Sequence, residues 1–253
     1  MTVSFSLEVI VLALILEYAA AALGMGYGTT ITPVLLMMGY SPGEVIPAVL
    51  LSQLIAGLLS SLAHHGLGNV DLRWGSHDMK VATVLSLAGF LGTVVAVLIA
   101  INVPPLLVKL YVALLVLGLG LALIWNRQRD FTFSWAKVAG LGLLAAFNKG
   151  LSGGGYGPLV VGGQILAGVE SRTAIGITAL AESFACLVGV VTYFVAGGSR
   201  VGWNLAPSLL LGAVLSVPLA ALTVRWLPPR RLRTMNAGVT TLLGGYLLLR
   251  LLI

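Results

Sequence analysis

Two short glycine-rich stretches, Gly24-Met25-Gly26-Tyr27-Gly28 and Gly153-Gly154-Gly155-Tyr156-Gly157, interrupt a chain that is otherwise almost wholly apolar. The second stretch follows the first after 129 residues (155 − 26 = 129), and each breaks a run that would otherwise be typical of a membrane helix. Glycine-broken hydrophobic segments at matching places in two halves are the best sequence indication of a secondary transporter's binding site. This pair therefore decides the fold and the class of function that we expect.

The composition requires a lipid environment. Of the 253 residues, 58% are hydrophobic and 9% are charged, and the mean hydropathy is +1.05. Soluble domains carry about 25% charged residues, and no soluble core could bury this much apolar surface. The net charge of +6 does not indicate a nucleic-acid partner, because the basic residues gather in two short loops, as expected of cytoplasmic loops. These residues are Arg127, Arg129 and Lys137 in one loop, and Arg225, Arg230, Arg231 and Arg233 in the other.

Ten hydrophobic segments follow one another in a single membrane domain, residues 1–253, with five in each of two repeats. The first repeat (1–125) holds 7–23, 29–38, 45–63, 81–101 and 106–124, and the second (134–253) holds 135–147, 156–166, 173–194, 205–222 and 235–252. A membrane span needs roughly 17–25 residues, so 29–38 and 156–166 are too short to cross alone. A second match supports the duplication: Pro104-Pro105 and Pro228-Pro229 (228 − 104 = 124), followed in register by Gly120 and Gly244.

Charge predicts the orientation of the two repeats. With both basic loops in the cytoplasm, loop 64–80 lies inside and its repeat partner, loop 197–204, lies outside. The glycine-broken pair at the start of each repeat must then make an even number of crossings, which a re-entrant hairpin does. We therefore expect an all-α integral membrane protein built as an inverted repeat. Each half is a re-entrant hairpin plus three transmembrane helices, and both termini are extracytoplasmic.

The glycine loops are candidates for binding an anion. Glycine adopts positive φ without a steric clash, and Pro158 suits the first turn of a following helix. Residues 153–157 should therefore present N–H groups at a helix N-terminus, which carries a partial positive charge. The alternative is that the glycines serve only close packing of helices. The candidate substrate-binding residues are Gly24, Gly26, Tyr27, Gly28, Thr29, Thr30, Asn148, Lys149, Ser152, Gly153, Gly154, Gly155, Tyr156 and Gly157.

Ionisable residues inside membrane helices are costly and are functional candidates by default. Glu182 lies well inside segment 173–194, and the matching residue of the first repeat is Gln53. Glu17 lies in the first segment. These three are candidates for carrying a coupling proton, and a structural, hydrogen-bonded role stays open for each. Lys149 directly precedes the second glycine loop, where it could offset an anion's charge or extend to water as a helix-end charge.

The string from Asn148 to Pro158, Asn-Lys-Gly-Leu-Ser-Gly-Gly-Gly-Tyr-Gly-Pro, resembles the signature of the sulfite exporter TauE/SafE family. The first half agrees, with Leu23 to Thr29 opening its hairpin and Gly66 to Asp71 ending its next helix, and the resemblance covers essentially the whole chain. It implies an inverted-repeat secondary transporter in the bacterial inner membrane that exports a small sulfur-containing anion, sulfite or an organosulfonate. Members of the family differ in substrate.

Three other interpretations stay open. Within transport, the same loops could serve an anion channel or a carrier for another small organic acid. From a different class, a membrane metalloenzyme is conceivable, because histidines and carboxylates bind metals and several gather near one expected cytoplasmic end. Their spacing fits no metal motif, and the sequence lacks G-x-S-x-G, H-E-x-x-H and Walker A patterns, so we expect neither an enzyme nor a metal or other cofactor. The histidines and carboxylates concerned are His64, His65, Asp71, His77 and Asp78.

Oligomeric state is not decided by the sequence. The glycines within 89–92 and 118–120 could pack helices within one chain or between two copies, so a homodimer stays open. The partners that the sequence indicates are a small anion and the lipid bilayer.

Overall fold

The structure is a computed structural model that describes residues 5–40, 42–100, 105–125, 132–152, 156–195 and 205–252. These residues form helices and short turns, with no strand among them. The all-α fold is therefore confirmed, and the helices follow the ten expected segments in order. They are α1 (Leu7–Leu23), α2 (Gly28–Met37), α3 (Pro42–Gly66), α4 (His77–Ala100), α5 (Pro105–Trp125), α6 (Trp135–Ser152), α7 (Tyr156–Leu166), α8 (Ser171–Val195), α9 (Ala206–Trp226) and α10 (Pro229–Leu252).

Several helices extend beyond their apolar segments. α4 begins at His77 and α10 at Pro229, four and six residues before the expected starts, and α6 continues to Ser152. Hydropathy detects only the part of a helix that lies in hydrocarbon, whereas the helix itself continues into the polar interface. The start of α4 has its own cap, because Met79 N donates to Ser76 Oγ at 3.1 Å.

The outward faces of the helices carry large apolar residues, and many small residues are buried between the helices. In α9, Gly212 and Ser216 are buried, whereas Leu211, Leu215 and Leu219 are exposed. This is the reverse of a soluble helix, and it suits a membrane, where small residues let backbones approach closely and lipid solvates leucine. Among the described residues, three stretches are long and apolar enough to span a membrane: Pro47–Gly66, Ser171–Val191 and Ala206–Trp226.

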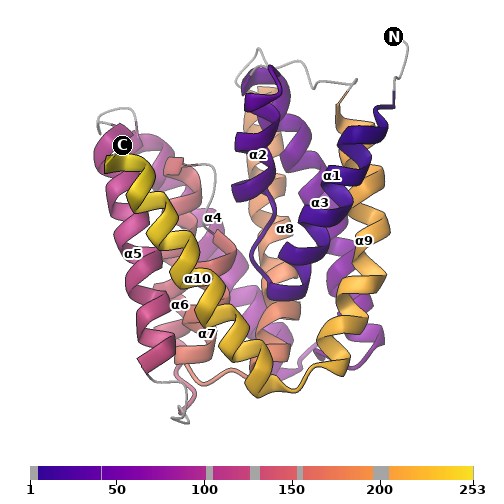
Figure 1. Cartoon of the computed structure of the whole chain (residues 1–253). Coiled ribbons are helices and arrows are strands. Elements are labelled where there is room, and N and C mark those ends of the chain that lie inside the picture. Colours follow the sequence, from indigo (N-terminus) through magenta and orange to yellow (C-terminus); the bar gives the residue numbers. More distant parts are fainter. Residues whose placement is uncertain are drawn as a thin grey trace.

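Four helices of the first half of the chain each pack against a helix of the second half. α4 lies along α6, α1 along α9, α3 along α8 and α5 along α10. In Figure 1, α5 and α10 lie on one side of the molecule, and α1 and α9 on the other. The α5–α10 pair is closest at two glycines, since a Cβ on Gly120 would lie 2.5 Å from Thr241 N and one on Gly244 would lie 2.5 Å from Leu117 Cα.

The two short helices lie toward opposite ends of the molecule. α3 and α8 run antiparallel, because Leu50 contacts Gly189 near one end of the pair and His64 contacts Gly176 near the other. α2 ends just before α3 begins, and α7 ends just before α8 begins. The α1–α2 hairpin therefore lies at one end and the α6–α7 hairpin at the other, as Figure 1 shows.

We expect Gly120→Ala to lower the melting temperature of the purified protein in detergent. The added Cβ would meet the Thr241 backbone, and overpacking of this kind costs about 1–3 kcal/mol. Gly118→Ala is the matched control on the same helix, because a Cβ there meets nothing within 4 Å among the described residues. Alanine also favours a helix over glycine by about 1 kcal/mol. Equal melting temperatures for the two variants would contradict the close α5–α10 contact.

Candidate substrate site

The first glycine stretch forms the turn between α1 and α2. Gly24 has φ +66° and Gly26 has φ +61°, in the left-handed region that residues with a Cβ rarely adopt. Gly24 ends α1, and the N–H of Met25 donates back to Ala20 O at 2.8 Å. The break in the helix is therefore closed by a local hydrogen bond, as a backbone inside a membrane requires.

α2 begins directly after this turn, with Tyr27 as its cap. The carbonyl of Tyr27 accepts hydrogen bonds from Ile31 N at 2.8 Å and from Thr30 N at 2.9 Å, and it also accepts one from Thr30 Oγ1 at 2.9 Å. The N–H groups of Gly28 and Thr29 are consequently terminal donors with no acceptor inside α2. The first glycine stretch is thus also followed directly by a helix N-terminus, as expected of the second.

The second glycine stretch is described only at its end. Tyr156 and Gly157 form the start of α7, and α6 extends up to the stretch. The predictions for the residues between them, and for several side chains, lie outside the described residues and stay predictions. These are Gly153, Gly154 and Gly155, and the side chains of Thr29, Asn148, Lys149 and Ser152.

The start of α7 packs on the first glycine turn. A Cβ on Gly157 would overlap the carbonyl group of Met25 and would lie 2.6 Å from Gly24 O, so only glycine fits at this position. Gly24 in turn lies against Val161 of α7 and Ile175 of α8. The structure thus brings the first turn of one hairpin into contact with the short helix of the other.

A small cavity lies between α1, α3, α8 and the first glycine turn. Its volume of about 30 Å³ admits water, which needs about 10–15 Å³, and is far below the roughly 300–1,000 Å³ of ligand pockets. A substrate would therefore need the cavity to widen. Two carboxylates and a carboxamide line it, with small residues around them: Glu17, Gln53 and Glu182, then Ala20, Ala21, Gly24, Gly26, Gly57, Ser60, Ile175, Thr178 and Ala179.

Gln53 and Glu182, which occupy matching positions in the two halves, face each other across this cavity. Gln53 Nε2 donates to Glu182 Oε1 at 3.5 Å, and Gln53 Oε1 accepts from Cys186 Sγ at 3.9 Å. Both side chains lie against the first turn, since a Cβ on Gly26 would lie 2.7 Å from Glu182 Oε2 and one on Gly28 would lie 2.8 Å from Gln53 Oε1. The glycines therefore let the turn approach both polar groups.

The two tyrosines of the glycine stretches are buried beside the turns and do not line this cavity as described. Tyr27 is 0% exposed, and its hydroxyl shares a hydrogen bond with Ser52 Oγ. Tyr156 is 1% exposed, and its hydroxyl lies near Gly89 of α4. Packing under the turns thus accounts for both rings in this conformation.

Sequence reasoning missed two cavity residues, Ser60 and Thr178. Thr178 Oγ1 donates to Ala174 O at 2.7 Å and accepts from Gln164 Nε2 at 2.8 Å. The signal that could have found them is helical spacing, because Ser60 lies seven residues after Gln53 and Thr178 four before Glu182.

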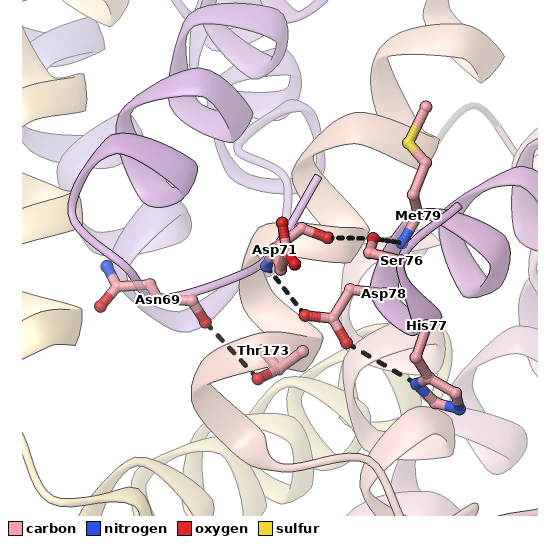
Figure 2. Close-up of polar contacts among 7 residues, drawn as sticks. All are labelled: Asn69, Asp71, Ser76, His77, Asp78, Met79 and Thr173. Carbon is pink, nitrogen blue, oxygen red and sulfur yellow. Dashed lines mark hydrogen bonds and ion pairs between the residues drawn. The ribbon is translucent and has the colours of Figure 1, made fainter. Parts of the chain in front are cut away.

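The residues of the alternative metal site mostly stabilise the loop between α3 and α4. Asp78 Oδ2 accepts from Asp71 N at 2.9 Å, and Asp78 Oδ1 lies 3.7 Å from His77 Nδ1 (Figure 2). His65 Nδ1 accepts from Leu72 N at 3.2 Å. Within the described part of the chain, no group of three or more His, Cys, Asp or Glu residues is arranged to hold a metal ion.

Comparison with known proteins gives the family. The model of the family described as sulfite exporter TauE/SafE matches residues 9–247. The chain belongs to the TauE/SafE family. A curated relative, "Probable membrane transporter protein YtnM" of Bacillus subtilis (strain 168), is 26% identical over 252 residues, which cover 94% of this chain and 78% of that protein. No solved structure matches.

The family and the relative together make this chain a membrane transporter, and the resemblance noted in its glycine motifs is confirmed. Both point to transport rather than to an enzyme. In this TauE/SafE protein, Gly24 and Gly26 of the first glycine motif line the cavity that holds Glu17 and Glu182.

We expect Gly26→Ala to reduce the transport activity of this protein by roughly tenfold or more, since a displacement of about 1 Å in a binding geometry can cost up to 10²-fold. The new Cβ would push Glu182 away from the turn. Gly39→Ala is the control, because Gly39 also has positive φ (+95°) but its Cβ would meet nothing within 4 Å among the described residues. Both variants carry a backbone strain of about 1–2 kcal/mol, and equal transport by both in proteoliposomes would contradict a role for this contact.

Proposed function

We propose that this protein is a secondary transporter that exports a small sulfur-containing oxyanion, sulfite or an organosulfonate, across the bacterial inner membrane. The observation that carries the proposal is the meeting of the first glycine turn with α7, Gln53 and Glu182 in a chain of the TauE/SafE family. Such a site, between two broken helical hairpins, is where secondary transporters bind their substrates.

The two halves, residues 1–125 and 134–253, form an inverted repeat. Reciprocal contacts support it: Gly142 of α6 packs on Ala88 of α4, and Gly212 of α9 packs on Ala13 of α1. Ala13 matches Gly142 at the offset of 129 (142 − 13 = 129), and Ala88 matches Gly212 at the offset of 124 (212 − 88 = 124). The two contacts are thus equivalent, as a two-fold axis between the repeats would require.

The α5–α10 pair supports the same symmetry. Gly120 meets Thr241 and Gly244 meets Leu117, and the offset of 124 (244 − 120 = 124) exchanges these two contacts. With α1–α2 and α6–α7 as re-entrant hairpins at opposite ends, each repeat has three spanning helices. The axis then lies in the membrane plane, and the glycine turns lie near mid-depth.

The end of the molecule that carries the α3–α4 loop faces the cytoplasm. Arg225 donates to Leu67 O at 2.6 Å and Arg172 to Leu227 O at 3.1 Å, so both arginines lie at this end. α1 begins and α10 ends at the other end (Figure 1), which makes both termini extracytoplasmic. Basic residues mark cytoplasmic loops and tryptophans mark membrane interfaces; those at or beside this end include Arg73, Trp74, Trp125, Trp135, Lys137, Trp226, Arg230 and Arg231.

The substrate anion binds at the helix N-termini of both glycine stretches, with Lys149 offsetting its charge. Glu17 and Glu182 line the same cavity, and carboxylates repel an anion strongly where water is scarce. A proton on one of them lets the anion occupy the cavity, so proton and anion bind together. This links transport to the proton gradient.

Alternating access follows from the size of the cavity. At about 30 Å³, the cavity is far smaller than the roughly 300–1,000 Å³ of ligand pockets. The two halves therefore rock to widen it toward one side and then the other. A channel would instead need a continuous pore. Saturating counterflow of the substrate separates a carrier from a channel.

We expect sulfite or sulfoacetate to raise the melting temperature of the purified protein. At a ligand concentration of 100 Kd, the free energy of unfolding should increase by about 2.7 kcal/mol. Taurine, sulfate and acetate are compared in parallel to define the substrate class. Lys149→Ala should remove the stabilisation, whereas Lys137→Ala, an exposed residue on the same helix, should retain it. If no anion stabilises the wild-type protein, the proposed substrate class is wrong. If both variants keep the stabilisation, Lys149 has no part in the site.

A further inference from the structure

A line of polar positions runs along α3 from the cavity to the cytoplasmic end of the helix. Gln53, Gly57, Ser60 and His64 are spaced by four, three and four residues, which places them on one face of the helix. Gln53, Gly57 and Ser60 line the cavity, and His64 lies one turn beyond it. This face packs on α8, where a Cβ on Gly176 would lie 3.3 Å from His64 Cβ.

Three polar atoms on or beside this line are buried without a hydrogen-bond partner among the described residues: Ser60 Oγ, His64 Nε2 and Asn69 Oδ1. The three side chains are only 2%, 0% and 3% exposed. A buried polar group without a hydrogen bond destabilises the folded protein, and such groups in a native protein call for an explanation, such as a visiting water or a catalytic role. Their alignment with the cavity suggests a common purpose.

Asn69 fixes where His64 carries its proton. Asn69 Nδ2 donates to Ala221 O at 2.9 Å, and because a carbonyl only accepts, the amide nitrogen must face this way. The same nitrogen lies 3.0 Å from His64 Nδ1, which therefore acts as an acceptor. The neutral imidazole consequently carries its proton on Nε2. Asn69 Oδ1, with no partner, is available to accept from Nδ1 once the amide rotates.

His64 is a titratable group that lies between the cavity and the α3–α4 loop, where α3 packs against α8. His65 points to the loop backbone, and the two nearby arginines donate to backbone carbonyls. Figure 2 shows Asn69 beside Thr173 of α8, apart from the pair of Asp71 and Asp78. Other titratable groups on the packed elements include Tyr18 of α1, His65 of α3, Arg172 and Cys186 of α8 and Arg225 of α9, with Glu17 and Glu182 at the cavity end.

We propose that His64 passes the coupling proton between the cytoplasmic loop and the cavity. A proton binds Nδ1 when the Asn69 amide rotates to present Oδ1, and the resulting imidazolium releases the Nε2 proton to water beside Ser60, from which it reaches Glu17 or Glu182. One proton enters the ring and one leaves, so the imidazole is neutral before and after. The step leaves the ring with its proton on Nδ1. This inference rests on the proton-coupled transport proposed above.

The test compares two movements in the same proteoliposomes: counterflow of labelled sulfite, and proton movement reported by a pH dye trapped in the lumen. His64→Gln keeps hydrogen-bonding atoms for Asn69 but cannot ionise. We expect it to retain counterflow within about twofold, and to lose proton movement by at least about tenfold, as loss of a general acid–base group does. His65→Gln is the matched control and should retain both movements. Ser60→Ala, at a residue that also lines the cavity, should slow proton movement more than it slows counterflow.

The outcomes separate this inference from the proposed function. If wild-type protein moves sulfite without protons, the proposed coupling is wrong, and the role of His64 falls with it. If the wild type couples the two and His64→Gln still moves protons at the wild-type rate, only the inference about His64 is overturned. Equal loss of counterflow and proton movement in His64→Gln and Ser60→Ala would assign these residues a structural role and overturn it as well.

Discussion

Peptide groups at bilayer depth must find hydrogen-bond partners inside the protein, and the arrangement of this molecule depends on that requirement. The chain leaves helical geometry at Gly24 and Gly26, and the break is closed by Met25 N and covered by the start of α7 at Gly157. A break in the first half of the chain is therefore enclosed by a short helix from the second half. The first half alone would leave this turn uncovered, which favours the packing of helices from the two halves against one another.

The packing of the two halves also brings an amide and carboxyl groups together at the cavity. Gln53 and Glu182 occupy matching positions, yet one is an amide and the other an acid. Two carboxylates facing each other would repel in a water-poor cavity, whereas an amide can donate to the acid opposite. The second acid comes from α1, as Glu17, which has Ala146 at the matching position in the second half (17 + 129 = 146). The proposed repeats would therefore share a backbone plan but differ in their chemistry, which would give one chain an asymmetric site.

The sequence predicts most of this plan but less of the cavity. Paired glycine motifs and segment lengths predict the helix order and the broken helices, because helix breaks are local properties of the chain. The wall of the cavity depends on how helices distant in sequence pack, and hydropathy carries no such information. Thr178 illustrates the limit: its hydroxyl donates to Ala174 O as in many membrane helices, so nothing local distinguishes a threonine that faces a cavity. Helix ends were misjudged where charged residues continue a helix into the interface, as at the start of α10.

The packing also indicates where alternating access would open the molecule. The glycines of the α4–α6 contact meet alanine, leucine and backbone atoms, which gain little from exposure to water, and the α1–α9 contact adds a hydrogen bond between Tyr18 and Thr223 that separation would break. The α3–α8 contact instead holds Gln53, Glu182 and Ser60, and its buried polar atoms gain hydrogen bonds when water enters. Separating α3 from α8 therefore costs less than separating the other pairs, because hydration offsets the lost contacts. The polar contact between α3 and α8, which holds the proposed proton path, is thus also the contact at which the proposed rocking would admit water and substrate.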